Sequence, residues 1–267
     1  MTFSRFDQLP SHKGLSLFIT AGYPRRDDTL PLLTALQGCE VDFVEVGFPF
    51  SDPVADGPTI QEGNQIALAN GMSVARLFEQ LSSLRPSGIT LPILLMGYLN
   101  PVERFGRERF FEQAAACGVD GLILPDMPFD QYLSMYKPLF QKHSIKPVFL
   151  VTSRTESERV RAFDAEKPAF IYVVSSDAVT GGKIKVNEER DAFFERLAGM
   201  GLSSRLIVGF GVSDRESFNA VTKHTSGAII ASAFLRALRE APQGEHQSAS
   251  DPKALSAITT TFIKQVR

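Results

Sequence analysis

Two carboxylates in segment 41–61 have the setting that acid–base chemistry needs. Glu45 lies near the end of an apolar run of β-branched and aromatic residues, a pattern typical of a buried parallel strand. Asp56 follows in a stretch interrupted by prolines, which can form neither a helix nor a central strand and must be a shaped loop. Two carboxylates in such different surroundings can hold different protonation states, which permits acid and base catalysis at one pH.

Both acids and their neighbour Asp52 have other interpretations. A buried charge is costly unless it is paired or functional, which favours a functional role for Glu45. Asp52 precedes a proline and could simply shape the loop as an Asx turn. Asp52 and Asp56 could also bind magnesium, but glycine-rich loops later in the chain can hold a phosphate without a metal. The four histidines show no ligand spacing, so no zinc site is expected. We therefore expect no metal site.

Three loops late in the chain combine glycine with small hydroxyl residues. They contain Thr180 with Gly181, Gly209 with Gly211, and Ser232 at the start of the last helical segment before a polar connection. Glycine lets backbone N–H groups approach an anion, and a helix N-terminus adds unpaired donors. One such loop would be an ordinary turn, but three after successive strands predict a phosphate site.

Aromatic residues near other predicted strand ends could surround these groups. Phe18, Tyr98 and Tyr172 could belong to the ordinary core, or they could contact a flat apolar ligand. The lone Gly-x-Gly at Gly209 lacks the dinucleotide fingerprint, and the chain has no nucleophile elbow and no CxxC pair. The sequence thus offers carboxylates rather than a metal, a thiol or a flavin.

Eight apolar runs, most of them separated by segments with helical spacing, are expected to position these groups. Repeated alternation of strand and helix predicts a parallel sheet, and eight units in 267 residues fit one (β/α)8 TIM barrel over residues 1–267. An open doubly wound sheet is the alternative. Extra helices are expected at the N-terminus, residues 2–8, and after the second strand, within 60–70. The predicted strands are 15–20, 41–46, 92–96, 119–124, 147–152, 169–174, 205–208 and 228–231.

Composition argues against several classes of partner. A net charge of −2 and a pI near 6.1 supply no basic field for nucleic acid. No stretch approaches the roughly 20 apolar residues that span a bilayer, and the first residues contain no apolar signal, so we expect a cytoplasmic protein without a membrane partner. Cys39 and Cys117 are expected to be small buried thiols rather than a disulfide or redox pair.

Longer motifs resemble one family, the alpha subunit of tryptophan synthase. The signature is VEVGFPFSDPVADGPTIQ at 44–61, and supporting matches are FITAGYP at 18–24, MGY at 96–98, PDMP at 125–128, VTG at 179–181 and GFG at 209–211. The chain departs from the family's usual pattern at Asp177 and Ala178 in the sixth loop and at Ala231, where the family usually has glycine. These motifs span most of the chain.

The resemblance implies a (β/α)8 barrel that cleaves indole-3-glycerol phosphate to indole and glyceraldehyde 3-phosphate. Glu45 and Asp56 would be its catalytic acids, with Glu45 acting at the ring carbon and the glycerol hydroxyl and Asp56 at the ring nitrogen. Proton transfers at these positions are what a retro-aldol cleavage requires. By the same resemblance Thr180 closes the sixth loop over Asp56. The remaining residues that it assigns are Gly181, Gly211 and Ser232 on the phosphate and Phe18, Tyr98 and Tyr172 along the pocket.

A partner and a second role are also implied. The chain would hand indole to a beta subunit that carries pyridoxal phosphate, in an alpha2-beta2 heterotetramer, and would need no cofactor itself. The residues expected at this interface are Pro49, Asp52, Pro53 and Pro128. Two alternatives remain open. The chain could be a weakly catalytic subunit that mainly binds and activates the beta subunit, because loops of this kind complete catalytic sites and the sixth loop is altered here. It could also be another phosphate-binding barrel enzyme.

Overall fold

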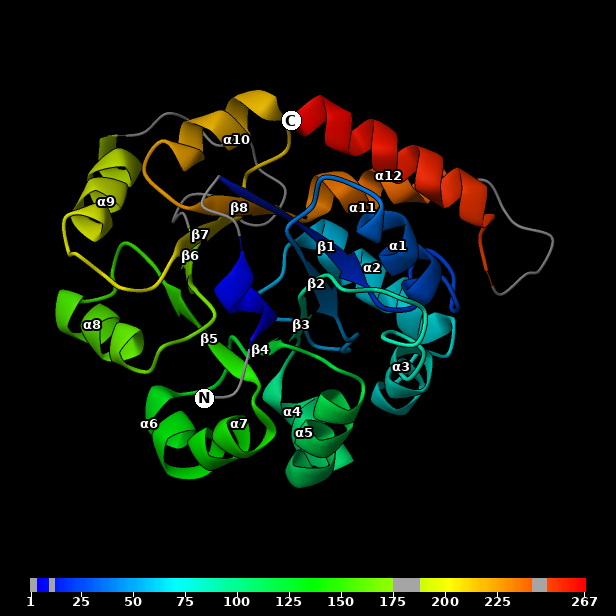
Figure 1. Cartoon of the computed structure of the whole chain (residues 1–267), viewed down its shortest axis with the longest axis horizontal. Helices are drawn as coiled ribbons and strands as arrows, with labels where there is room; N and C mark the ends of the chain where they lie inside the picture. The colour runs from blue at the N-terminus through cyan, green and yellow to red at the C-terminus, as the bar shows by residue number, and fades with distance from the viewer. Residues whose placement is uncertain (1–3, 10–12, 175–187, 242–248) are drawn as a thin grey trace.

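The computed structural model describes residues 4–9, 13–174, 188–241 and 249–267. Its centre is a closed barrel of parallel strands that follow one another in chain order from β1 to β8 (Figure 1). The barrel confirms the predicted fold class and excludes the doubly wound sheet, and each predicted strand is present. The strands are β1 Gly14–Thr20, β2 Phe43–Gly47, β3 Ile93–Met96, β4 Gly121–Ile123, β5 Lys146–Val151, β6 Ile171–Val174, β7 Leu206–Gly209 and β8 Gly227–Ile230.

Helices surround the barrel, and both expected additions are found. The N-terminal one is a short 3₁₀ helix, η1, and the one after β2 begins at Pro58, where the fixed φ of proline suits a first helical position. The helices are η1 Arg5–Gln8, α1 Thr29–Gln37, α2 Pro58–Ala69, α3 Val74–Leu81, α4 Leu99–Phe105, α5 Arg107–Ala116, α6 Phe129–Gln131, η2 Tyr132–Tyr136, α7 Lys137–His143, α8 Ser157–Ala165, α9 Glu188–Ala198, α10 Arg215–Thr222, α11 Ser232–Arg239 and α12 Pro252–Val266.

Aromatic rings close the amino-terminal end of the barrel. Phe6 of η1 packs edge-on against Phe43 at the start of β2, with ring centroids 5.6 Å apart, and lies 6.2 Å from the ring of Phe170. All three side chains are buried. Because apolar rings fill this end, polar chemistry is left to the carboxyl-terminal end, where the loops after the strands meet.

Acids at the amino-terminal end have structural partners. Asp42, just before β2, accepts the N–H of Leu15 at 2.7 Å, and Asp120, just before β4, accepts the N–H of Ile93 at 2.8 Å. Asp120 also forms an ion pair with Arg85 at 2.7 Å. These carboxylates join the start of one strand to the next. Their hydrogen bonds and the ion pair account for their burial, and Glu45 has no such structural role.

The remaining expectations concern membranes and thiols. Within the described ranges, none of the helices is both long and apolar enough to cross a bilayer. Cys39 and Cys117 are free thiols; Cys117 is buried as predicted, whereas Cys39 is only half-buried.

Candidate active site

Glu45 lies inside the barrel wall with almost no contact with solvent. It sits in β2 between Phe18 of β1 and Leu94 of β3, and only 1% of it is exposed. Its Oε2 atom has no hydrogen-bond partner among the described residues. Burial, reinforced by the charge of Asp56, raises the pKa of Glu45 to about 8. Glu45 therefore carries a proton at neutral pH and can donate it.

Phe18 lies close to Glu45 because a glycine makes room for its ring. Phe18 is the register partner of Glu45 and is 4% exposed. A Cβ atom on Gly47 would come within 2.6 Å of the Phe18 ring, so a larger residue there would displace it. The predicted pocket aromatic and the predicted acid are thus on neighbouring strands.

Asp56 is held by Tyr98 in the loop between β2 and α2. The Tyr98 hydroxyl donates to Asp56 Oδ2 at 3.2 Å and accepts the N–H of Ala55 at 3.0 Å. Burial raises the pKa of Asp56 to about 6, while the Tyr98 bond acts in the opposite direction. Burial and the charge of Asp56 also raise the pKa of Tyr98, so its hydroxyl keeps the proton that it donates. Asp56 is therefore mainly ionised at neutral pH.

Tyr172 of β6 brings a third group to the same region. It is 5% exposed, and burial together with the charges of Glu45 and Asp56 raises its pKa well above the usual value. Its hydroxyl stays neutral beside two carboxyl groups. The site thus combines a protonated Glu45, an ionised Asp56 and a neutral phenol, which can give, take and hold protons at one pH.

Gly209, predicted to contact substrate, has a steric role in the barrel. A Cβ atom at this position would lie 1.8 Å from the Tyr172 hydroxyl oxygen, so only glycine admits that side chain. Two residues on, Gly211 has a φ of 77°, in the left-handed region that favours glycine. Phe210 between them has a φ of 80° and its ring lies 6.1 Å from that of Tyr172. The GFG turn therefore shapes both the aromatic wall and the loop.

Ser232 opens α11 with a hydroxyl that lacks a partner. It is 7% exposed, and its Oγ atom makes no hydrogen bond within the described part of the chain. The preceding residue, Ala231, caps the helix without a side-chain bond, and its φ of −112° lies outside the left-handed region that favours glycine. Thr180, Gly181, Asp177 and Ala178 lie outside the described residues.

The residues predicted to meet a partner differ in exposure. Asp52 and Pro128 are exposed, Pro53 is half-buried, and Pro49 is buried, so Pro49 can shape the loop but offers a partner little surface. Sequence reasoning expected the partner to contact the loop from Phe48 to Pro58 but did not single out Val54, which is 83% exposed and is the most exposed large apolar side chain described. The sequence signal that could have indicated Val54 is its position as an apolar residue in a loop of prolines and acids.

Two polar residues of α2 were also missed. Gln61 Nε2 donates to the carbonyl oxygen of Asp56 at 2.8 Å, and Asn64 Oδ1 accepts the N–H of Phe50 at 3.1 Å. They are three residues apart, which puts them on one face of the helix. This three-residue spacing directly after the loop was the only sequence signal that the two side chains could hold it.

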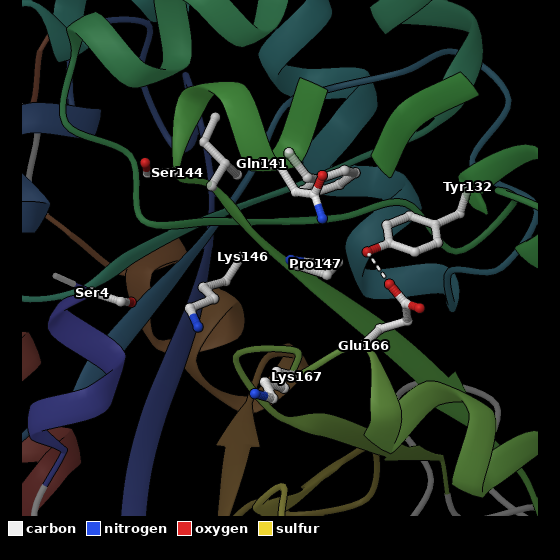
Figure 2. A pocket seen from close by; sticks show the side chains of 10 residues that line it. Ser4, Tyr132, Gln141, Ser144, Lys146, Pro147, Glu166 and Lys167 are labelled. Carbon is white, nitrogen blue, oxygen red and sulfur yellow. Dashed lines mark hydrogen bonds between the residues drawn. The ribbon is translucent and has the colours of Figure 1, made fainter. Parts of the chain in front are cut away.

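A separate pocket of about 260 Å³ lies at the other end of the barrel, beside the start of β5 (Figure 2). Lys146 and Lys167 line it together with Tyr132, whose hydroxyl donates to Glu166 at 3.2 Å. Glu166 is further paired with Lys137 at 2.8 Å. None of the predicted site residues that the structure describes lines this pocket. Among the described residues no cluster of His, Cys, Asp and Glu could hold a metal ion.

Comparison with known proteins identifies the family. The family model "Tryptophan synthase alpha chain" matches residues 6–263. The alpha chain of Flavobacterium johnsoniae is 45% identical over 88% of this chain and 92% of that protein, and the one from Christiangramia forsetii is 43% identical over 93% and 96%. The crystal structure of tryptophan synthase subunit alpha from Legionella pneumophila has a TM-score of 0.85 at 29% identity and covers 99% of both chains. The chain therefore belongs to the tryptophan synthase alpha chain family.

Proposed function

We propose that Glu45 and Asp56 are the acids with which this alpha chain cleaves indole-3-glycerol phosphate to indole and glyceraldehyde 3-phosphate. Glu45 donates its proton to the ring carbon that bears the glycerol chain, and Asp56 accepts the proton of the ring nitrogen. The Glu45 carboxylate then takes the proton of the adjacent glycerol hydroxyl while the carbon–carbon bond breaks. The bonding electrons return to the ring, Asp56 gives its proton back to the nitrogen, and both acids regain their starting states.

The single observation that carries this proposal is the contrast in pKa between the two acids. Glu45 has a pKa of about 8 and Asp56 a pKa of about 6. Between these values the first is mainly protonated and the second mainly ionised, which is the starting state that the proposed sequence requires. Phe18, Tyr98 and Tyr172 would line the indole end of the site.

We propose that the phosphate group binds opposite the acids, at the loops after β6, β7 and β8. Support comes from the unpaired Ser232 hydroxyl at the N-terminus of α11 and from the left-handed turn at Gly211. Thr180 and Gly181 are assigned to the same site on the family's pattern. Gly209 acts there indirectly, because it makes room for Tyr172.

The chain is expected to work with a beta subunit. Membership of the alpha chain family implies such a partner and is consistent with a chain that needs no cofactor of its own. We propose further that the partner carries pyridoxal phosphate, that two chains of each kind form a heterotetramer, and that residues 1–267 act as one catalytic domain. The cytoplasm is the proposed location, since free thiols suit a reducing compartment. Val54 joins Asp52, Pro53 and Pro128 as a proposed contact.

The test is turnover of indole-3-glycerol phosphate by the chain alone and with its beta subunit. Glu45→Gln and Asp56→Asn keep side-chain shape and should each lower kcat by about 10²–10⁴. Glu40→Gln, the same change at an exposed acid before β2, is the matched control and should keep the wild-type rate. Near-normal rates in the first two variants would remove these acids from their roles. A wild-type chain that activates the beta subunit without releasing indole would favour the activating-subunit alternative.

A further inference from the structure

Two side chains of α2 hold the loop that carries Asp56: the exposed Gln61 donates to the carbonyl of Asp56, and the buried Asn64 holds the entry of the loop. Asn64 is 6% exposed, and it bonds both to the entry of the loop and to the first turn of α2 itself. Its Oδ1 atom accepts the N–H of Phe50 at 3.1 Å, and its Nδ2 atom donates to the carbonyl oxygen of Ile60 at 2.9 Å. The entry of the loop is thereby fixed against the helix that follows it, fourteen residues along the chain.

The N–H of Phe48 donates to the carbonyl of Met96 at 2.9 Å and so ties the end of β2 to β3, but the backbone bonds further along the loop provide no such anchor. The N–H of Val54 reaches the carbonyl of Asp52 at 2.9 Å, and the N–H of Asp56 reaches the carbonyl of Pro53 at 3.0 Å. Both are local turns, which shape the loop but leave its placement on the barrel undetermined. Placement must come from contacts with other elements.

From Phe50 the connection continues to the catalytic acid through aromatic packing. The rings of Phe50 and Tyr98 lie 5.4 Å apart, and the Tyr98 hydroxyl donates to Asp56 Oδ2 at 3.2 Å. Asn64 thus sets the position of Phe50, Phe50 supports the ring of Tyr98, and Tyr98 holds the Asp56 carboxylate. Each step is a direct contact between neighbouring groups.

We propose that Asn64 is a positioning residue for Asp56. The proposal rests on the proposed role of Asp56 and extends it to a side chain that touches neither acid. Its physical basis is that a catalytic group displaced by about 1 Å can lose about 10² in rate. A buried amide that pairs with a backbone N–H gives such a loop one preferred placement, because the unpaired alternative leaves a buried donor unsatisfied.

Asn64→Ala is therefore expected to lower kcat by about tenfold to 100-fold. The affinity for glycerol 3-phosphate, measured by calorimetry, should stay within about twofold, because the proposed phosphate loops lie on other strands. A third readout is the acid limb of the pH profile. The Tyr98 bond lowers the pKa of Asp56, so weakening that bond should move the acid limb to higher pH. A merely structural asparagine would move neither kcat nor this limb.

Asn70→Ala is the matched control, since it is the same residue type at the end of the same helix. Its amide donates to the carbonyl oxygens of Gly22 at 2.9 Å and Pro24 at 3.1 Å, which belong to a different loop. We expect it to lower the melting temperature while kcat stays within about twofold. If Asn64→Ala loses stability to a similar degree and keeps its kcat, the proposal is wrong.

Phe50→Ala keeps the proposal testable should Asn64→Ala fail to fold. It leaves α2 intact and removes the ring that supports Tyr98, so kcat should fall at least about fivefold with glycerol 3-phosphate affinity retained. An unchanged kcat in this variant would overturn the connection from Asn64 to Asp56. The wild-type chain is measured alongside: an inactive wild type would contradict the proposed function, whereas an active wild type with unaffected variants would contradict the role of Asn64 alone.

Discussion

Replacing Glu45 by glutamine should stabilise the protein against alkali while it destroys activity. Glutamine keeps the shape of the protonated carboxyl group but cannot ionise. In the folded chain the pKa of Glu45 is about 8, compared with an ordinary value of 4.5. Because the folded-state pKa is raised, the contribution of Glu45 to stability is fully present below pH 4.5 and is lost as the pH rises towards 8.

The size of this effect follows from the two pKa values. Each tenfold change in proton affinity is worth about 1.4 kcal/mol, so the wild type should lose about 3 kcal/mol relative to the glutamine variant between pH 5 and pH 8. Glu45 is 1% exposed, so solvent does little to reduce the penalty. Asp56, whose pKa is raised to about 6, changes in both proteins, so its own effect largely cancels in the comparison.

Urea unfolding at pH 5 and pH 8 measures the difference directly. The two proteins should show equal denaturant slopes and a gap in unfolding free energy that widens with pH, in favour of Glu45→Gln. Glu40→Gln, at an exposed site, should follow the wild type at both pH values. Parallel stability curves for wild type and Glu45→Gln would refute the claim that Glu45 is protonated in the fold.

Four further predictions concern the loops and the partner. Tyr98→Phe removes a bond that lowers the pKa of Asp56, so the acid limb of the activity profile should move above about pH 6, and an unmoved limb would contradict this. Gly211→Asp should weaken the binding of glycerol 3-phosphate, measured by calorimetry, at least about tenfold, because it places a negative charge beside an anion site. Gly88→Asp is the control and should leave this affinity unchanged, since Gly88 has a similar φ of 81° and open space around it. In a titration with the cognate beta subunit, glycerol 3-phosphate should raise the affinity between the subunits. The beta subunit should raise the affinity for glycerol 3-phosphate by the same factor. Val54→Asp should weaken the complex, and unaltered binding would remove Val54 from the interface.

The barrel and its acids could be predicted because their signals are local. Strands buried on both faces have continuous apolar sequences, and this pattern predicted all eight strands. Glu45 interrupts such a run, and its Oε2 atom has no hydrogen-bond partner among the described residues. Asp42 and Asp120 instead lie just before strands and accept backbone N–H groups. A carboxyl group without a hydrogen-bond partner inside an apolar strand indicates function.

Other parts of the site depend on contacts between distant segments and leave no local pattern. Asn64 looks like a surface residue of a helix, and only the fold of the loop places the N–H of Phe50 against it. The sequence placed Gly209 in a phosphate loop, but the structure requires glycine there because any side chain would clash with Tyr172 on the neighbouring strand. Phe6 likewise closes the barrel only through contacts with distant residues, Phe43 of β2 and Phe170 just before β6.

The pH dependence of kcat/KM for indole release tests the central claim most directly. This quantity reports the ionisations of the free enzyme, and for an interacting pair the two limbs belong to the pair. A protonated Glu45 and an ionised Asp56 predict a bell-shaped profile with limbs near pH 6 and pH 8. The profile should keep its acid limb in any residual activity of Glu45→Gln and lose the alkaline one. A wild-type activity that is constant from pH 5 to pH 9, or an alkaline limb that survives in Glu45→Gln, would contradict the assignment of the two acids.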